Sequence, residues 1–283
     1  MANQRLEKDE DPPIVGACVK GDLARVRAQF EAGSLTLRSR GGRSLVHIAV
    51  QNGYVDLTRW LLDKGASLDT TDDRGNTPLS NYVRSHCELE MVELVLDAGI
   101  AIDHPNDDRW TALAFACHWD SRWNELVAVL LDRGADPNAR TVEGWTPLLI
   151  ACHKRVVANG PSNVLLARDL DVNVAGAVFG FTPLMMAVRG MPLVVVEALV
   201  AKGADPDARM KIRNGKKPKP TASTLASNIY RELRVADTYD GWTARDWGAR
   251  GARKKLIAAA LGSSARSRVR QSRTVSPSAK SER

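Results

Sequence analysis

Apolar and polar positions follow a pattern that recurs along this chain about every 34 residues. A short block of the form Gly-x-Thr-Pro-Leu, or a close variant, begins at positions 42, 75, 109, 144, 180 and 241. After each of the first five, a second block has its apolar residues at helical spacing, as in 56–69 and 195–207. Such a period is typical of a repeat protein in which each unit is one small helical motif that packs on its neighbours.

Both blocks contain residues that begin or end helices. Thr77, Thr146 and Thr182 predict helix N-caps, and the Pro after each fits the first helical position, where no amide donor is needed. The second blocks end in a Gly that supplies the positive φ of a helix C-terminus, namely Gly65, Gly99, Gly134 and Gly203. Asp169 replaces this Gly in one repeat and is expected to adopt the same conformation. Each repeat is thus predicted to form two helices, a glycine that ends the second helix (a Gly stop), and a short extended segment that leads to the next repeat.

The openings, the Leu-Leu-x-x-Gly-Ala-Asp-x-Asn ends and the period resemble the ankyrin repeat. The resemblance covers residues 11–261 as about seven repeats, of which 11–41 and 241–261 are degenerate caps. It implies an all-α solenoid of helix-turn-helix units with short β-hairpin-like fingers, whose tips and first helices line a concave side. The His that usually follows Thr-Pro-Leu occurs here only as His47, so its hydrogen bond between repeats is expected there alone. The other repeats have Ser80, Ala114, Leu149 and Met185 at this position.

Three segments lie outside the regular repeats: residues 1–10, an insertion at about 209–238, and a Ser/Arg-rich tail at 262–283. Both ends are expected to be disordered, because they have too few apolar residues to fold. The insertion opens with six bases and no acid, namely Arg209, Lys211, Arg213, Lys216, Lys217 and Lys219. Residues 250–283 have a net charge of +9, which leaves the rest of this +7 chain acidic. Both basic stretches are either solvated surface or contacts for a polyanion or an acidic partner.

Alignment of the repeats predicts two registers of side chains on the concave side. The first register, directly after the opening residue of each repeat, holds Arg43, Asn76, Trp110, Trp145, Phe181 and Trp242. Its rings either form an exposed stripe suited to an interface or rest on a neighbouring hairpin. The second register, at the end of the first helix, holds Gln51, Arg84, His118, His153, Arg189 and Arg250, with Trp119 and Lys154 just beyond. It is either an ordinary polar face or, beside the rings, a site for an acidic protein surface or stacked nucleotides.

No arrangement of residues predicts catalysis. The chain has no P-loop, GxGxxG, GxSxG or HExxH motif. The pairs Cys117-His118 and Cys152-His153 suggest zinc, but consecutive helical side chains point about 100° apart and do not share one ligand sphere. Packed structural cysteines are therefore favoured. We expect no catalytic residue, no metal and no cofactor.

The four cysteines lie far apart, which favours reduced thiols in a cytosol-like compartment. The N-terminal residues lack an apolar signal region, and the longest apolar run is six residues, too short to span a bilayer. These features predict a cytoplasmic monomer without a membrane partner. Secretion as an effector and nuclear entry remain open, because the basic tail is compatible with both.

The leading functional hypothesis is a non-catalytic scaffold that captures a partner protein with an acidic surface on its concave side. Such a protein could serve as an inhibitor, an immunity-type protein or a host-targeting effector. The alternative is a nucleic-acid-associated adaptor that uses the basic insertion and tail. Both interpretations start from the resemblance to a binding fold and from charge, since fold alone does not define function.

Overall fold

The computed structural model describes residues 11–209, apart from 32, 119–120, 154–159 and 177–179. The chain divides into two compact units. The N-terminal unit comprises Met1–Ala116 and Glu125–Asp136, and the C-terminal unit comprises Cys117–Asn124 and Pro137–Arg283. The N-terminal segment 1–10, the tail and all of the insertion except its first residue lie outside the described residues.

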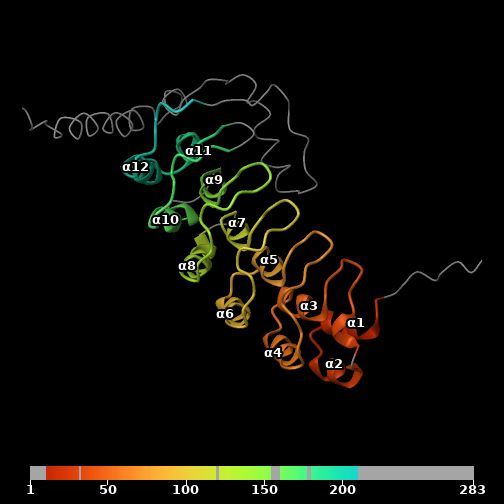
Figure 1. Ribbon diagram of the computed structural model, residues 1–283. Coiled ribbons are helices and arrows are strands. Elements are labelled where there is room, and N and C mark those ends of the chain that lie inside the picture. Colours follow the sequence, from red (N-terminus) through yellow and green to blue (C-terminus); the bar gives the residue numbers. More distant parts are fainter. Residues whose placement is uncertain (1–10, 32, 119–120, 154–159, 177–179, 210–283) are drawn as a thin grey trace, which may run out of the picture. The chain divides into compact units, whose positions relative to one another are not determined.

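The N-terminal unit is built from helix pairs. Its helices are α1 (Pro13–Val19), α2 (Leu23–Gln29), η1 (Ser34–Thr36), α3 (Leu45–Gln51), α4 (Val55–Asp63), α5 (Pro78–Val83), α6 (Leu89–Asp97), α7 (Ala112–Ala116) and, from Glu125 on, α8 (Asn124–Asp132). In Figure 1 the first helices α1, α3 and α5 form one row and the second helices α2, α4 and α6 form another. Contacts join α1 to α3, α3 to α5 and α5 to α7 along the first row. α3 and α5 are therefore each enclosed between two neighbouring first helices.

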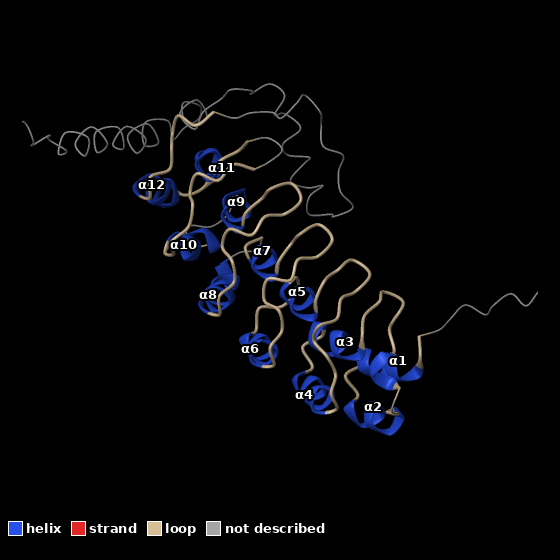
Figure 2. Ribbon diagram, viewed as in Figure 1, coloured by secondary structure: helices blue, strands red, loops and turns tan. Residues whose placement is uncertain are grey.

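The C-terminal unit repeats the same arrangement. Its helices are η2 (Ser121–Trp123), α9 (Pro147–His153), α10 (Pro161–Leu166), α11 (Pro183–Gly190) and α12 (Leu193–Ala201). Here α9 packs on α11 and α10 on α12, and each first helix also packs on its own second helix. The described residues contain helices and no strand, apart from one isolated bridge between Arg38 and Ser44 (Figure 2). The predicted all-α class is confirmed.

The predicted N-caps are present. The hydroxyl of Thr77 accepts a hydrogen bond from the backbone N–H of Ser80 at 3.2 Å, and that of Thr182 accepts from Met185 at 3.3 Å. Thr146 does the same with the N–H of Leu149 at 3.3 Å. Since each hydroxyl replaces a partner that the first helical turn lacks, the Thr-Pro pair determines where the helix begins.

The predicted Gly stops are also present, with one exception. Gly65, Gly99, Gly134 and Gly203 all have φ between 85° and 91°. Asp169 does not take this conformation, because Arg109 is the single non-glycine residue with positive φ in the described part of the chain. The helix before Asp169, α10, ends already at Leu166, and its C-cap residue Ala167 stays in the right-handed region. Our prediction for Asp169 was wrong. Because α10 ends three residues earlier, at Leu166, Asp169 is not the residue that follows the helix and needs no positive φ.

A tight hairpin turn precedes the first helices α5, α7 and α9. In the turn of residues 72–76, the N–H of Asp72 donates to the carbonyl of Asn76 at 3.0 Å and that of Gly75 donates back to Asp72 at 2.9 Å. The turns at 106–110 and 141–145 have the same pair of hydrogen bonds. The fourth residue needs a positive φ, which Gly75 (72°) and Gly144 (76°) reach without strain. Arg109 has the same backbone conformation, with φ 59°.

Buried polar side chains connect three successive repeats of the N-terminal unit. Asn81 Nδ2 donates to Asp72 Oδ2 at 2.9 Å and to Nε2 of the fully buried His47 at 3.0 Å. Because an amide nitrogen only donates, His47 accepts at Nε2 and carries its proton on Nδ1. Asn76 donates to the Asp72 carboxylate and accepts from Asn106 Nδ2 at 3.0 Å. The predicted hydrogen bond of His47 to the next repeat is thus present.

This environment shifts two pKa values. Desolvation lowers the pKa of His47 to about 4; Asp72 opposes this shift, whereas Arg43 and Arg38 act with it. Desolvation tends to raise the pKa of Asp72, but hydrogen bonds from Asn81, Asn76 and two backbone N–H groups outweigh it and lower the pKa. At neutral pH the network therefore pairs a neutral imidazole with a carboxylate.

The strained turn gives a first testable prediction. Arg109→Gly should raise the free energy of unfolding by about 0.5–1 kcal/mol, because relief of the left-handed strain exceeds the added entropy of the unfolded chain. Gly75→Ala should lower it by about 2 kcal/mol. A Cβ at Gly75 would lie 2.7 Å from Asp107 Oδ1 and 2.9 Å from the Asp107 backbone nitrogen. Urea unfolding of both variants measures the effects, and a destabilised Arg109→Gly variant would contradict the assignment of strain.

The buried imidazole gives a second prediction, on pH dependence. Because the pKa of His47 falls from 6.5 to about 4 on folding, the unfolded chain binds a proton that the folded chain does not. Stability should therefore decrease as the pH falls from about 6.5 to 4, by up to about 3 kcal/mol from this group. Urea unfolding at several pH values should show a shallower decrease for His47→Gln than for the wild type. Equal pH dependences would refute the role of His47.

Candidate partner-binding surface

The two predicted registers contact each other within the repeats. In the N-terminal unit Arg43 Nη1 donates to Gln51 Oε1 at 2.8 Å. In the C-terminal unit the ring of His153 meets that of Trp145 edge to face at 5.5 Å, and the Arg189 guanidinium lies 5.9 Å from the centre of Phe181. Each pair joins residues eight positions apart. The hairpin side chain thus rests on the end of the first helix of its own repeat.

This packing buries the aromatic rings. Trp110 and Phe181 are each 2% exposed and Trp145 is 6% exposed. Our interpretation of these three residues as an exposed stripe was wrong. Each of the three rings has a contact within its own repeat, and the alternative that they rest on a neighbouring hairpin stays a prediction. A ring that covers the adjacent helix end removes more apolar surface from water than one that projects into solvent.

The same arrangement in the N-terminal unit uses an additional aromatic residue. Trp110 stacks on Phe115 of α7 with ring centres 5.1 Å apart. The guanidinium of Arg84 lies 5.5 Å from the Phe115 ring centre, and its Nη1 is 3.5 Å from Asn81 Oδ1. Sequence analysis missed Phe115, because the helical pattern marks it only as a core residue. Its position beneath a cation follows from the contact of successive first helices.

The polar members of the second register are in part accessible. Arg84, His153 and Arg189 are half-buried, and each lies against an aromatic ring. His118 is only 7% exposed, so little of its side chain can reach a partner. Trp119, Lys154, Trp242 and Arg250 lie outside the described residues. The rings are thus buried in the protein, whereas the polar side chains of Arg84, His153 and Arg189 are partly exposed.

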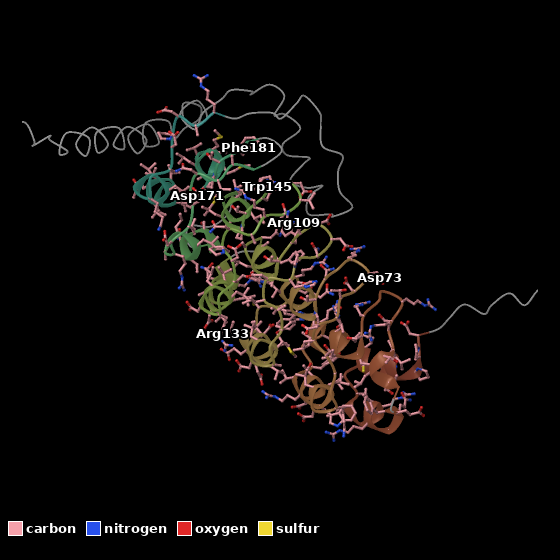
Figure 3. All side chains as sticks on the ribbon, viewed as in Figure 1. Asp73, Arg109, Arg133, Trp145, Asp171 and Phe181 are labelled. Carbon is pink, nitrogen blue, oxygen red and sulfur yellow. The ribbon has the colours of Figure 1, made fainter. Side chains whose placement is uncertain are left out.

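The hairpin tips contribute exposed residues that sequence analysis did not select. Arg74, Asp107 and Arg109 are exposed in the N-terminal unit, and Arg140 is exposed in the C-terminal unit beside Val142, which is 53% exposed. Figure 3 labels Asp73 and Arg109 on the tips of the hairpin loops. The sequence did contain a signal for Arg109. The repeat openings before and after it begin with glycine, at Gly75 and Gly144, whereas this one begins with arginine.

The buried cysteines are suited to packing. Burial raises the pKa of Cys18 and of Cys152 to about 12, and burial followed by the neighbouring Cys152 raises that of Cys117. These thiols stay protonated at neutral pH and are poor nucleophiles and metal ligands. Within the ranges that the structure describes, no three His, Cys, Asp or Glu side chains are grouped to hold a metal ion.

Of the six basic residues predicted to contact a polyanion or an acidic partner, the structure places one. Arg209 is exposed at the end of the described part of the chain. The remaining five, Lys211, Arg213, Lys216, Lys217 and Lys219, lie outside it. Among the described helices, none has the length and apolar character needed to cross a bilayer.

Comparison with known proteins identifies the repeats. A family model described as ankyrin repeats in three copies matches residues 14–106, 46–141 and 121–210. The chain is similar to the ankyrin repeat domain-containing protein OPG015 of Monkeypox virus, with 34% identity over 70 residues. It is 32% identical over 94 residues to the E3 ubiquitin-protein ligase KEG of Arabidopsis thaliana and 31% identical over 99 residues to diacylglycerol kinase iota of Mus musculus.

These similarities are confined to parts of the relatives. The matched segments amount to 22%, 31% and 33% of this chain, and to 16%, 6% and 9% of the viral, plant and mouse proteins. What is shared is the repeat itself, which indicates a scaffold for protein–protein interaction. Because the family model covers more than half of the chain, and the capped helix pairs and hairpin turns agree with it, this protein belongs to the ankyrin-repeat family.

Proposed function

We propose that this protein is a non-catalytic scaffold that captures a partner protein with the hairpins and the C-terminal ends of the first helices. The observation that supports it best is the group of partly exposed polar side chains held on buried rings, Arg84 on Phe115, His153 on Trp145 and Arg189 on Phe181. The partner surface complementary to two arginines is acidic.

The buried rings favour binding by fixing these side chains in advance. A free arginine loses considerable rotamer freedom when it is immobilised at an interface. Arg84 is already restrained by Phe115 and Asn81, and Arg189 by Phe181 and by Met186, whose Sδ lies 3.9 Å from Nη1. The entropic cost of ordering them is thus largely met in folding, so that more of the contact energy remains for affinity.

Such a surface suits a stoichiometric binder that occludes its target, as an inhibitor or an immunity-type protein would. It also suits an effector that engages a host protein. The identity of the captured partner distinguishes these roles. A nucleic-acid-associated adaptor is the second candidate, favoured by the excess of six bases in residues 209–219 and of nine in 250–283. Polyphosphate binding would depend on those segments, whereas protein capture would depend on the repeats.

A third prediction tests the capture surface. The immobilised full-length chain is used to capture its partner from its native source, and the dissociation constant of the purified partner is then measured. Arg84→Glu and Arg189→Glu should each weaken binding at least about tenfold, because each replaces a restrained cation with a charge that repels an acidic partner. Thermal unfolding and helical circular dichroism should change little, since both side chains are partly exposed.

Arg59→Glu is the matched control, because Arg59 is an exposed arginine in a second helix, α4, away from the hairpins. Its variant should bind like the wild type. If neither Arg84→Glu nor Arg189→Glu weakens binding relative to this control, the partner uses another surface.

A fourth prediction separates the two candidate functions. A variant that lacks 209–219 and 262–283 should keep its affinity for the partner protein, with a weak dependence on salt. A nucleic-acid adaptor would instead lose its affinity for DNA or RNA on the same deletion. For the wild type, the logarithm of the association constant would decrease linearly with the logarithm of the salt concentration. DNA or RNA binding that survives the deletion would contradict the assignment of nucleic-acid binding to the insertion and the tail.

A further inference from the structure

Arg109 is held in a strained backbone conformation that its own side chain does nothing to support. Its φ of 59° is the one positive value among the described non-glycine residues, and the matching positions 42, 75, 144 and 180 are all glycine. A β-carbon in this region costs roughly 1–2 kcal/mol. Strain of this kind is frequent where function requires the residue.

The turn would form without this arginine. Asn106 Oδ1 accepts hydrogen bonds from the N–H of Trp110 at 2.8 Å and of Asp108 at 3.1 Å, and its Nδ2 donates to Asn76 at 3.0 Å. The backbone of Arg109 adds one hydrogen bond, from its N–H to the Asn106 carbonyl at 2.8 Å. Any residue that tolerates positive φ would keep these contacts, so the guanidinium is not needed for the hairpin.

The guanidinium of Arg109 is also available for binding. The side chain is exposed and forms no hydrogen bond or ion pair within the part of the chain that the structure describes. The same is true of Arg74, on the preceding hairpin of the N-terminal unit. The two tips are adjacent, because the N–H of Asp107 donates to the carbonyl of Arg74 at 3.1 Å. Two unpaired guanidinium groups therefore project from neighbouring tips.

Two acidic residues of these tips, Asp107 and Asp73, lie close to the glycine of the preceding hairpin. The carboxylate of Asp107 lies directly over Gly75, where Oδ1 would be 2.7 Å from an added Cβ, and that of Asp73 lies in the same way over Gly42. These positions keep both carboxylates close to the preceding hairpin. A planar guanidinium matches a carboxylate in a contact of two hydrogen bonds, so these arginines can each bind one carboxylate.

We propose that Arg109, together with Arg74, binds the side-chain carboxylates of an acidic segment in the partner protein, and that the backbone strain at position 109 is retained for this contact. This inference rests on the proposed scaffold function and specifies the chemistry of the partner. A planar guanidinium can bind a carboxylate through two parallel hydrogen bonds, which gives orientation as well as attraction. Glycine at this position would give a more relaxed turn with no such donor.

The fifth prediction is tested with an octaglutamate peptide, so that it does not depend on a captured partner. The ¹⁵N-labelled full-length protein is titrated with the peptide at about 50 mM salt, where screening is moderate. The Nε–Hε signals of Arg109 and Arg74, assigned from single variants, should shift and saturate, while that of Arg59 should not. Arg109→Gly should weaken peptide binding at least threefold, Arg109→Lys should weaken it less, and Arg59→Ala should leave it unchanged.

The inference is overturned if Arg109→Gly binds the peptide like the wild type, if the Arg109 signal does not move, or if all arginine signals move alike. The stability of Arg109→Gly provides a check on folding, since this variant is expected to have a higher urea midpoint than the wild type. Loss of affinity in a more stable protein can then be assigned to the missing guanidinium. Failure of partner capture would count against the scaffold function alone, because the peptide titration is independent of it.

Discussion

The burial of the first helices α3, α5, α7, α9 and α11 is the constraint on which the rest of the structure depends. Every described residue from Pro78 to Val83 in α5 and from Pro147 to Cys152 in α9 is buried. A helix of six or seven residues is too short to be stable alone and acquires its stability from the neighbours that cover it. Once the whole helix is covered, only its C-terminal end and the hairpin before it can meet a partner. Within the first half of each repeat, binding residues can therefore occupy few positions.

This constraint also explains the positions of the aromatic residues. A hairpin side chain that follows the turn lies eight residues before the exposed end of its own first helix, and that end would otherwise leave apolar atoms in water. Trp145 and Phe181 cover it, and the polar residues His153 and Arg189 lie on the outer side of the rings. The rings thus contribute to folding energy, while the side chains of His153 and Arg189 stay partly exposed. Recognition by such a surface depends on charge and hydrogen bonds more than on apolar area.

The sequence predicted what depends on local chemistry. The caps at Thr77, Thr146 and Thr182 and the Gly stops involve contacts within one turn of a helix, so that the residue types nearly determine them. The conformation of Asp169 was mispredicted because the period does not show that α10 ends early. The repeat period also did not determine whether the rings are buried. It indicates only the side of the repeat on which the Cα–Cβ bond of each residue points. Whether the ring turns back onto its own helix depends on rotamers and on three-dimensional packing.

The two units differ in the buried side chains that align their first helices. In the N-terminal unit, directional hydrogen bonds from His47 through Asn81 and Asp72 to Asn106 tie three repeats together, and few offsets would satisfy all of them. In the C-terminal unit, the residues matching His47 are the buried, apolar Leu149 and Met185. Apolar packing tolerates small changes in position better than a buried polar network does, since it leaves no donor or acceptor unpaired. Protonation of His47 at low pH would therefore loosen the alignment in the N-terminal unit and leave the apolar contacts of the C-terminal unit intact.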